Sequence, residues 1–404
     1  MNQCIFEINA SNTGSTGGIM LQIADIIKRQ GFEVVVCCPD SRTNRPKKTE
    51  DTYFIGNRFS RNLHLTFRKL FGLAGFLSVF STLKLIKKMK QHECKLVHLH
   101  NIHGDYINYP LLFHFIKKKN IPVIWTLHDC WTFTGRCPYF ELIKCQQWQQ
   151  GCKKCPYPRN LYPEAKIDTT RFMWACKKKW FTGIERCVVV TPSHWLADLA
   201  KKSFLGNYPI SVIHNGIDLD TFKPRQSDFR KKYQLEDKKI VLGVAFGWEY
   251  RKGLDVFVEL SKKLPENYKI VLVGTDSNVS RSIPDNILSI NRTQNRIELA
   301  EIYSAANVFV NPTREENYPT VNMESIACGT PVITFKTGGS PEILDKNSGV
   351  VVPCDNINLL EKEIYHICEN HPNMQNMCIE RAKSFDNKAR FNEYIKLYCK
   401  MLES

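Results

Sequence analysis

The sequence predicts an α/β protein made of two doubly wound domains in tandem. The chain has 404 residues, which is more than one ordinary hydrophobic core accommodates. Short apolar runs alternate with helical patterns along the chain, as in parallel βαβ units, and the alternation restarts after Pro224. We therefore expect a first domain at residues 1–222, a second at 223–385, and a C-terminal helix at 386–404 that returns to the first domain.

The first predicted domain alternates buried strands with helices. Its strands are expected at residues 4–8, 33–38, 96–99, 123–127 and 187–191. Its helices are expected at residues 19–30, 76–91 and 195–204. Ligands of such sheets bind beyond the carboxyl ends of the strands, so those ends are the first places to search for a site.

The second predicted domain repeats this pattern. Its strands are expected at residues 239–243, 269–273, 308–310 and 331–334. The turn at Asn215-Gly216 and the closing Pro224 mark the connection between the domains. With two such domains, the space between them is the expected ligand site.

The net charge of +16 indicates anionic partners, such as phosphate-bearing substrates, acidic lipid or nucleic acid. The most apolar long stretch, residues 70–80, has about half of the ~20 residues that a membrane-spanning helix needs. The N-terminus lacks the basic and then apolar pattern of a secretion signal. We expect a cytoplasmic protein whose 16 cysteines are mostly reduced.

A glycine-rich stretch follows the first predicted strand and precedes a helix. It contains Gly14, Gly17 and Gly18, and glycines let backbone amides approach a phosphate or a sugar at a helix N-terminus. Asp40, at the end of the second strand, lies where a ribose-binding acid would lie in a dinucleotide fold, but the glycine spacing does not fit that motif. Two interpretations of this stretch are therefore open, a purely structural turn and a loop that binds a ligand.

Two glutamates, Glu316 and Glu324, flank Pro319 in the stretch 311–333. Because proline suits the first turn of a helix, we predict that a helix begins near Pro319. Glu316 then lies in the loop just outside it, and Glu324 lies about one turn inside. The helix start leaves three amides free to face an anion, those of Thr320, Val321 and Asn322. A carboxylate there can bind the two hydroxyls of a ribose, or the acids can simply favour the helix dipole.

Several motifs, in order along nearly the whole chain, resemble the retaining GT-B glycosyltransferases of family four. The nucleotide-sugar site of that family has two glutamates separated by seven residues, as in Pro312–Glu316 with Glu324–Ile333 and then Gly338–Glu342. Further similar stretches are Gly17-Gly18, Val212–Asp218, Phe222–Pro224 and Arg251–Gly253. The branch that builds bacterial exopolysaccharide and O-antigen units is similar at Val97–His103, Trp125–Gly135 and Thr191–Trp195.

The resemblance implies a GT-B fold, in which two Rossmann-like domains face each other across a cleft. It implies that Glu316 contacts the donor sugar, Lys252 contacts the diphosphate and His128 reaches the reacting sugar. It places the donor also at Glu324 (the ribose), Arg251, Thr320, Val321, Asn322, Gly17 and Gly18. One departure is at Phe246, near which the family often has an arginine; Arg251 is the candidate substitute.

The implied activity is transfer of a sugar, with retention of configuration, from a UDP- or GDP-sugar to a lipid-linked saccharide in surface polysaccharide synthesis. No catalytic metal is expected, because Lys252 and the amides of the helix start supply the positive potential that the diphosphate needs. A nucleotide-sugar epimerase of the same fold is the alternative. A phosphorylase would need a pyridoxal-binding lysine context that is not found. A nucleic-acid-binding protein is less favoured, because no recognition module stands out apart from the cysteine cluster, and we expect no nucleic acid partner.

A cysteine-rich insert is expected at about residues 130–160. Its four cysteines are Cys137, Cys145, Cys152 and Cys155. The last two form a Cys-x-x-Cys pair followed by proline, which fits a structural zinc site. Four reduced thiols in a loop are the alternative interpretation.

Two further clusters have competing interpretations. Residues 58–90 combine many lysines and arginines with a large apolar face, which suits a helix lying on anionic lipid at the inner face of the cytoplasmic membrane. A solvated basic face over a core stripe is the alternative.

His98, His100 and His103 have spacing that could suit a metal, but histidines at strand ends are more often satisfied by hydrogen bonds.

Overall fold

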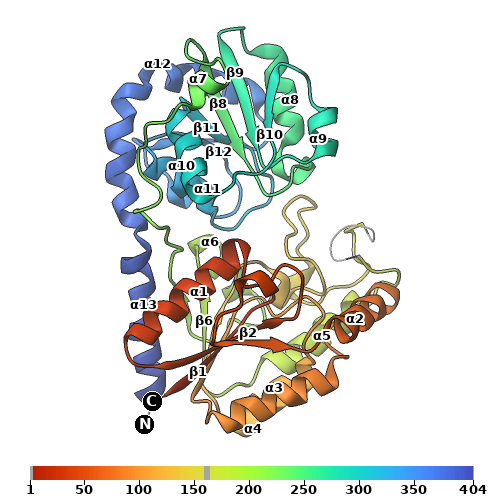
Figure 1. Cartoon of the computed structure of the whole chain (residues 1–404). Coiled ribbons are helices and arrows are strands. Elements are labelled where there is room, and N and C mark those ends of the chain that lie inside the picture. The colour runs from red at the N-terminus through yellow and green to blue at the C-terminus, as the bar shows by residue number, and fades with distance from the viewer. Residues whose placement is uncertain (1–2, 159–163, 404) are drawn as a thin grey trace. The chain divides into compact units, whose positions relative to one another are not determined.

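The computed structural model describes residues 3–158 and 164–403. The chain divides into two compact units (Figure 1). The first contains the residues up to His214 together with Arg390–Ser404, and the second contains Asn215–Ala389. The division therefore falls after His214, whereas the sequence placed it after residue 222.

The first unit is built on a seven-stranded parallel sheet in the order β3-β2-β1-β4-β5-β6-β7. The strands are β1 (Cys4–Ile8), β2 (Glu33–Pro39), β3 (Thr52–Ile55), β4 (Leu96–Leu99), β5 (Val123–Thr126), β6 (Cys187–Thr191) and β7 (Ile210–Val212). The order reverses between β1 and β4, which is the switch point at which doubly wound sheets bind ligands.

Helices cover both faces of this sheet. They are α1 (Gly14–Arg29), α2 (Arg58–Phe71), α3 (Val79–Gln91), α4 (Tyr109–Lys118), α5 (Thr170–Phe181), α6 (His194–Lys202) and the C-terminal α13 (Asn387–Glu403). On one face, α1 and α13 pack with Ile5 of β1 in a common core (Figure 1). On the other face, α3 and α4 pack with Phe6 of the same strand. Neighbouring residues of β1 thus enter different cores, as strand alternation requires.

The second unit has a six-stranded parallel sheet in the order β10-β9-β8-β11-β12-β13. The strands are β8 (Lys239–Val244), β9 (Tyr268–Val273), β10 (Ile287–Ile290), β11 (Val308–Asn311), β12 (Val332–Phe335) and β13 (Gly349–Val352). The helices are α7 (Phe229–Lys232), α8 (Leu254–Lys263), α9 (Ser277–Ser282), α10 (Arg296–Ala305), α11 (Thr320–Ala327) and α12 (Ile357–Ala382). The switch point lies between β8 and β11. Two Rossmann-like doubly wound sheets are present, so the predicted fold class is confirmed.

Some helix limits differ from the prediction. Helix α1 begins at Gly14 rather than at residue 19, and α3 begins at Val79 rather than at residue 76. The start of α1 has a physical basis in Gly17, where a Cβ atom would lie 2.5 Å from the backbone carbon of Asn12. Only glycine lets the β1–α1 loop fold this closely onto the first turn.

Within the described parts of the chain, we find no helix that combines the length and the apolar character needed to cross a bilayer.

Candidate active site

The loop after β11 and the start of α11 form the centre of the site in the second unit. Helix α11 begins at Thr320 with Pro319 at its N-cap position, as predicted, and no side chain caps it. The amides of Thr320 and Val321 are therefore available to an anion at the positive end of the helix dipole. The amide of Asn322 donates to the carbonyl oxygen of Pro319 at 3.2 Å, so the prediction that it is free is wrong. The loop that carries Glu316 lies between β11 and this helix.

Glu316 and Lys252 form an ion pair with 2.6 Å between Nζ and Oε2. Both side chains are about one-fifth exposed. Burial alone would raise the pKa of Glu316, but Lys252 and the backbone amide of Asn317, which donates to Oε1, hold this pKa below its ordinary value. Glu316 is therefore a carboxylate at neutral pH, and the sequence-predicted pair lies together at the carboxyl edge of the sheet.

Two glycines explain how these distant segments meet. Gly253 follows Lys252 with a φ of +75°, and a Cβ atom there would lie 2.5 Å from the carbonyl oxygen of Pro312. Gly338 has a φ of +52°, and a Cβ atom there would overlap the carbonyl oxygen of Glu316. Both positions need a backbone that side-chain-bearing residues rarely adopt, and both allow a close approach to the loop that carries Glu316.

Arg314 fixes the same loop from beneath and was missed by sequence reasoning. It is 5% exposed, and its guanidinium donates to Asp255 at 2.8 and 2.7 Å and to Asp355 at 2.8 Å. A bidentate pair with a buried guanidinium orders the loop with geometric specificity, although both carboxylates are about half exposed. The Pro312–Glu316 motif suggested an active role only for its glutamate, because the partners of Arg314 lie far away in the sequence.

Glu324 lies one turn inside α11, as expected, and is buried. Its Oε2 accepts a hydrogen bond of 3.3 Å from the hydroxyl of Tyr303. Burial raises the pKa of Glu324, although Arg296 and the hydrogen bonds of Tyr303 and Thr320 act in the opposite direction. The carboxyl group thus has a fixed orientation and can accept or donate when a ligand hydroxyl approaches.

The remaining donor-side residues occupy different environments. Asn322 is fully buried; its Oδ1 accepts from Asn311 at 2.8 Å, while its Nδ2 has no hydrogen-bond partner among the described residues. Val321, at the same helix start, packs partly buried against the core of the second unit. The side chain of Arg251 bonds Glu249 at 3.1 Å and the carbonyl oxygen of Glu315 at 3.2 Å.

Phe246, at the position where the resemblance led us to expect an arginine, is 91% exposed. The guanidinium carbon of Arg292 lies 5.4 Å from the centroid of its ring. Arg292 therefore brings a cation to this position from a different loop, after β10. No local sequence pattern indicates this contact, because the two residues are far apart in the chain.

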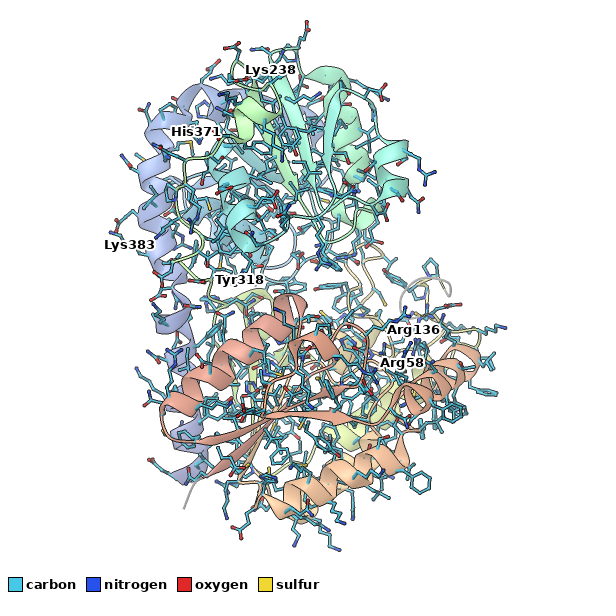
Figure 2. All side chains as sticks on the ribbon, in the orientation of Figure 1. Arg58, Arg136, Lys238, Tyr318, His371 and Lys383 are labelled. Carbon is cyan, nitrogen blue, oxygen red and sulfur yellow. The ribbon has the colours of Figure 1, made fainter. Side chains whose placement is uncertain are left out.

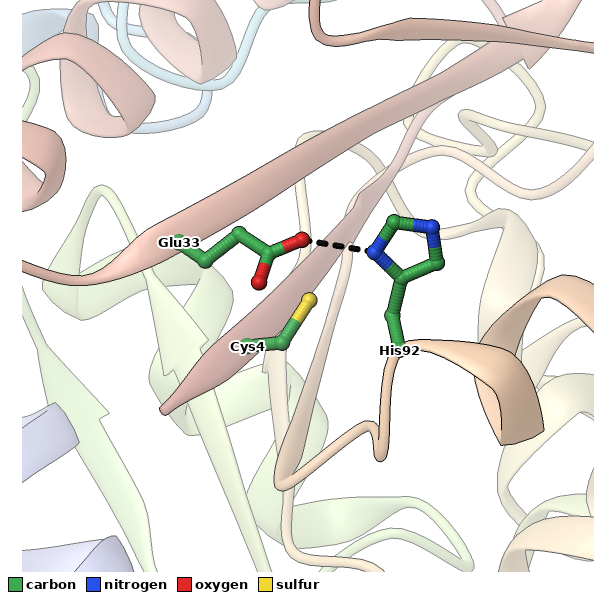
Figure 3. Close-up of side chains that lie close together, drawn as sticks. All are labelled: Cys4, Glu33 and His92. Carbon is green, nitrogen blue, oxygen red and sulfur yellow. Dashed lines mark hydrogen bonds and ion pairs between the residues drawn. The ribbon is translucent and has the colours of Figure 1, made fainter. Parts of the chain in front are cut away.

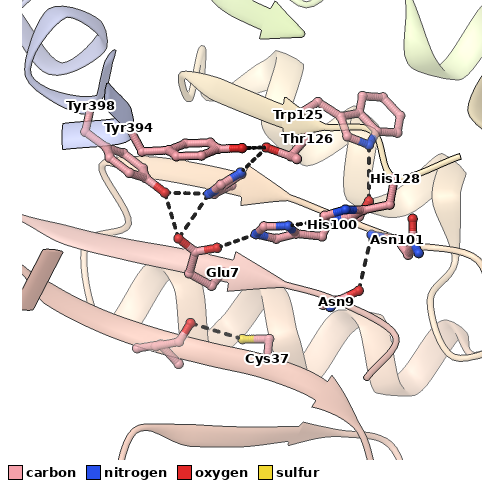
Figure 4. Close-up of polar contacts among 12 residues, drawn as sticks. Glu7, Asn9, Cys37, His100, Asn101, Trp125, Thr126, His128, Tyr394 and Tyr398 are labelled. Carbon is pink, nitrogen blue, oxygen red and sulfur yellow. Dashed lines mark hydrogen bonds and ion pairs between the residues drawn. The ribbon is translucent and has the colours of Figure 1, made fainter. Parts of the chain in front are cut away.

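His128 lies two residues beyond β5 in the first unit and is buried (Figure 4). Its Nε2 lies 3.0 Å from Nδ1 of His100, and Nε2 of His100 lies 2.8 Å from Glu7. Burial and the neighbouring His100, His98 and His103 lower the pKa of His128 well below its ordinary value. His128 is thus a neutral imidazole and cannot stabilise a developing cation by charge.

The carboxylate of Glu7 sets the direction of this hydrogen-bonded chain. Although burial opposes its charge, His98 and His100 lower the pKa of Glu7 to about 2, so it can only accept. Burial lowers the pKa of His100 to about 4, so this ring is neutral and donates from Nε2 to Glu7. Its Nδ1 is then an acceptor, and His128 donates to it from Nε2.

The histidine cluster has hydrogen-bond partners that account for its burial. His98 bonds Glu7 at 3.1 Å and Thr126 at 2.8 Å, while His103 bonds Asp129 at 3.1 Å. The hydroxyl of Tyr398 from α13 also donates to Glu7, at 2.7 Å (Figure 4). His98 and His100 therefore both bond the buried carboxylate of Glu7, and His103 bonds Asp129 instead.

Gly17 and Gly18 lie within the first turns of α1 and not in the loop before it. Gly17 is buried against the backbone of Asn12, which is a packing role. Gly18 is partly exposed, and a Cβ atom there would meet only the end of Gln22, at 4.0 Å. Of the two glycines, only Gly18 leaves space for a ligand.

The four cysteines of the insert lie in a segment with its own aromatic core. Trp148 is 1% exposed, stacks on Phe140 and contacts Phe133. The amide of Gly135 donates to the sulfur of Cys152 at 3.2 Å. Among the described residues, three groups have metal-binding atoms within 4.8 Å of one another, and these cysteines form none of them. The segment thus has an apolar anchor that the sequence did not indicate.

One such group, Cys4, Glu33 and His92, lies at the amino ends of β1 and β2 (Figure 3). His92 Nδ1 lies 2.6 Å from Glu33, and burial raises the pKa of the Cys4 thiol to about 12. Ligands of doubly wound sheets bind at the carboxyl ends, so this group lies at the wrong edge to take part in the site.

The fold and the site together define a class of protein. Two Rossmann-like sheets, a lysine–carboxylate pair at a carboxyl edge and an uncapped helix start are the features of a glycosyltransferase with the GT-B fold. The sequence profile of the family described as Glycosyltransferase Family 4 matches residues 19–221, and that of Glycosyl transferases group 1 matches residues 225–385. The chain belongs to glycosyltransferase family 4.

Known relatives agree with this assignment. WcaC of Escherichia coli strain K12, whose name assigns it to colanic acid biosynthesis as a glycosyl transferase, is 28% identical over 265 residues. That match covers 64% of this chain and 64% of the length of WcaC. The chain matches 43% of the length of a D-inositol 3-phosphate glycosyltransferase from Mycobacterium sp. strain JLS, at 27% identity over 44% of this chain.

Solved structures share the fold over the whole chain. Sucrose-phosphate synthase from Thermosynechococcus elongatus has a TM-score of 0.73 at 19% identity, with both chains fully covered. HepE from Anabaena, solved in complex with UDP-glucose, has a TM-score of 0.69 at 12% identity and covers 99% of this chain and 100% of its own.

Proposed function

We propose that the enzyme transfers a sugar from a nucleotide diphosphate donor to a lipid-linked saccharide in bacterial surface polysaccharide synthesis, with retention of configuration. The observation that carries this proposal is the Lys252–Glu316 pair in the unit whose α11 begins without a cap. The UDP-glucose bound to HepE and the colanic acid assignment of WcaC support the donor class and the pathway class.

The donor diphosphate binds Lys252 and the amides at the start of α11. This requires Lys252 to turn at least partly from Glu316 to the phosphate oxygens. Glu316 then contacts the donor sugar, while Glu324 binds the ribose hydroxyls from inside the helix. Oxygen anions at a helix N-terminus beside a lysine are a favourable combination of dipole and charge.

Charge development explains why these groups accelerate the reaction. The diphosphate gains negative charge as its bond to the sugar breaks, and Lys252 with the helix amides stabilises that charge. Arg251 and Arg292 are the candidates for a second cation, because Phe246 offers none. His128 orients the reacting sugar through hydrogen bonds, since its imidazole is neutral. No divalent metal takes part, so we expect EDTA to leave transfer intact unless it disturbs the fold.

A thermal-shift screen against UDP, GDP and their sugars tests the donor class. A ligand at about 100 times its Kd stabilises the protein by about 2.7 kcal/mol. We expect one nucleotide to raise the melting temperature of the wild type, and a much smaller rise in Lys252→Ala. Absence of any shift with every nucleotide diphosphate would contradict the proposal.

The cysteine segment is proposed to hold a structural zinc ion. Cys137 and Cys152 are buried, and the amide donor of Gly135 is well placed to stabilise a thiolate at Cys152. Elemental analysis of protein made in zinc-replete medium should show equimolar zinc, which Cys152→Ser loses and Cys176→Ser keeps. No zinc in the wild type would reject the site.

Helices α2 and α3 are proposed to bind the anionic inner surface of the cytoplasmic membrane. Phe59 and Phe80 are 78% and 81% exposed. The other large exposed apolar residues of these helices are Leu63, Leu70, Phe71, Val79 and Leu83. Exposed basic residues on the same helices are Arg58, Lys84, Lys87 and Lys90. Apolar side chains among lysines and arginines suit the interface of anionic lipid.

Liposome flotation at low salt tests the membrane surface. We expect binding to vesicles that contain anionic lipid and weaker binding to neutral vesicles. Phe59→Ser with Phe80→Ser should abolish binding, whereas Phe246→Ser, an equally exposed aromatic in the other unit, should not. No binding of the wild type at low salt would reject the surface.

A further inference from the structure

A cavity of about 260 Å³ opens in the first unit between α2, the loop after β4 and the loop after β5. Its principal polar and aromatic residues are Arg61, Arg68, His103, Tyr109, Trp131 and Arg136. Neither the donor site nor the membrane surface described above uses it.

The cavity has more positive than negative charge. Arg68 is paired with Asp105, to which its Nε donates at 2.9 Å. The side chain of Arg61 makes no hydrogen bond or ion pair with any described residue. Within the described residues, neither Arg61 nor Arg136 forms a close ion pair, although Asp40 interacts with Arg61 and Asp168 with Arg136 at longer range.

Arg136 gives the strongest indication of a ligand; Figure 2 labels this residue and Arg58 of α2. One of its terminal nitrogens donates to the carbonyl oxygens of Tyr157 and Pro158, at 2.8 and 2.9 Å. Its Nε, however, is buried with no hydrogen-bond partner among the described residues. A buried charged donor without a partner is destabilising, so an anion in the cavity would stabilise this side chain.

The aromatic wall is held rigidly. Lys177 lies 3.3 Å from the ring centroid of Trp131 and donates to the carbonyl oxygens of Trp131 and Thr134. Tyr109 contacts the same indole with 5.7 Å between the ring centroids, nearly edge-on. Trp131 is 3% exposed, so it gives the cavity a rigid apolar wall rather than an open stacking face.

Helix α2 has two opposite faces, which connect the cavity with the proposed membrane surface. At 100° per residue, Arg61, Leu65 and Arg68 fall on the side that lines the cavity. Phe59, Leu63 and Leu70 fall on the opposite side and are exposed. A molecule anchored in lipid beside this helix can therefore place its head group against the arginines.

The cavity also adjoins the residues that carry His128. Trp131 follows His128 by three residues in the loop after β5, and His103 belongs to the loop after β4. Both loops leave the carboxyl edge of the sheet at neighbouring strands. A head group bound in the cavity is thus on the reacting side of the first unit.

We propose that this cavity binds the diphosphate group of a lipid-linked acceptor. The proposal rests on the lipid-linked acceptor of the proposed function, and it names the chemical group that the enzyme recognises. Arg61 and Arg136 bind the phosphate oxygens, and the apolar part of the lining, with Leu65 and Ile167, borders the carbon atoms next to them. Arginine is suited to this task because its planar fork matches phosphate oxygens.

Farnesyl diphosphate, an alkyl diphosphate below its micellar concentration, is the probe, and calorimetric titration of the full chain measures its Kd. We expect Arg61→Gln to weaken binding about tenfold or more, as loss of a charge-assisted hydrogen bond does. Arg61→Lys should recover part of the binding, and Arg42→Gln, the same change at an exposed position outside the cavity, should have no effect. Arg136→Gln should weaken binding as much as Arg61→Gln does. Because Arg136 also bonds the carbonyl oxygens of a loop, the result at Arg61 decides the test.

Three outcomes overturn the inference. One is farnesyl diphosphate binding that is unchanged in Arg61→Gln. Another is binding that is lost in Lys252→Ala instead, which would place the probe in the nucleotide site. The third is equally tight, Arg61-dependent binding of inorganic pyrophosphate, which would indicate a free-phosphate site. Failure of the proposed function has a different readout. If that function is wrong, no nucleotide diphosphate binds the wild type, and this result does not depend on how Arg61→Gln affects farnesyl diphosphate binding.

Discussion

Lys252 and Glu316 neutralise each other in the structure without ligand, and this has a functional consequence. The pair holds Glu316 in its ionised form at neutral pH, as the lowered pKa of Glu316 shows. A donor diphosphate that draws Lys252 away leaves Glu316 ready to interact with the positively charged sugar ring of the transition state. Ionised groups held in place in advance stabilise developing charge without reorganisation of the site.

Glu324 should act mainly on donor binding, because it is buried inside α11, one turn away from the bond that breaks. We expect Glu324→Ala to raise the donor KM roughly tenfold and to lower kcat by much less. Steady-state kinetics with varied donor measures the two constants. A fall in kcat with unchanged KM would contradict the assignment to the ribose, and Glu324→Gln is the shape-matched control.

Glu7 should position His128 through His100. Glu7→Gln removes the obligatory acceptor, so the His100 tautomer is no longer fixed and His128 loses its defined partner. We expect kcat to fall about tenfold, within the range for groups that orient a catalytic imidazole, with little change in donor KM and an altered pH profile. Tyr398→Phe removes another hydrogen bond of the same carboxylate and should leave kcat near the wild-type value. Equal effects of both variants would indicate a structural role alone.

The turn from Lys252 into α8 depends on Gly253, and a matched glycine isolates its role. Gly253→Ala and Gly247→Ala both place a side chain at a positive φ, of +75° and +92°, which costs about 1–2 kcal/mol. Only at Gly253 does the new Cβ meet another atom, the carbonyl oxygen of Pro312. We expect Gly253→Ala to lower both the melting temperature and activity distinctly more than Gly247→Ala. Equal effects, measured by calorimetry and transfer assay, would show that the contact is unimportant.

The central strands of both sheets could be predicted from the sequence, and the edges could not. Long apolar runs at β1, β4, β8 and β11 follow from burial on both faces. The four edge strands, β3, β7, β10 and β13, were not predicted. These are three or four residues long and largely half-exposed, so they lack a continuous apolar run.

The candidate site, like the fold, could be predicted from the sequence only in part. The start of α11 was predictable from Pro319, and the Lys252–Glu316 pair was predictable from motifs. Arg314 and Lys177 were not, because their partners lie in distant segments and no local pattern distinguishes a buried cation from a solvated one. The cysteine spacing also suggested that a zinc ion stabilises this segment. It did not indicate that Trp148 packs in an aromatic core of the same segment.

Buried neutral histidines make the whole molecule sensitive to acid. Burial lowers the pKa of His64 and His100 to about 4 and that of His128 well below its ordinary value, all in the first unit. In the second unit, burial lowers the pKa of His371 to about 4. An unfolded histidine titrates near 6.5, so below that pH the unfolded chain binds more protons. Each such group then lowers the free energy of unfolding by up to about 1.4 kcal/mol per pH unit, until the pH reaches its folded pKa.

We therefore expect the thermal transition of the first unit to fall more steeply than that of the second between pH 6.5 and pH 5. Scanning calorimetry at a series of pH values measures this. The carboxylate of Glu7 acts in a separate range, since its lowered pKa gives stability that is lost only below about pH 4. Equal pH dependence of the two transitions, or none, would contradict the account.

The central claim is that Lys252 and Glu316 act together on one donor. Its most direct test is the kcat/KM for sugar transfer by Lys252→Ala, Glu316→Ala and the double variant, each shown to be folded. We predict that each single change lowers kcat/KM by roughly 10²-fold or more, the range for loss of a preorganised charge stabiliser. The double variant should be little worse than the less active single variant, since coupled residues are not additive. Turnover near the wild-type rate in both folded single variants would contradict the account.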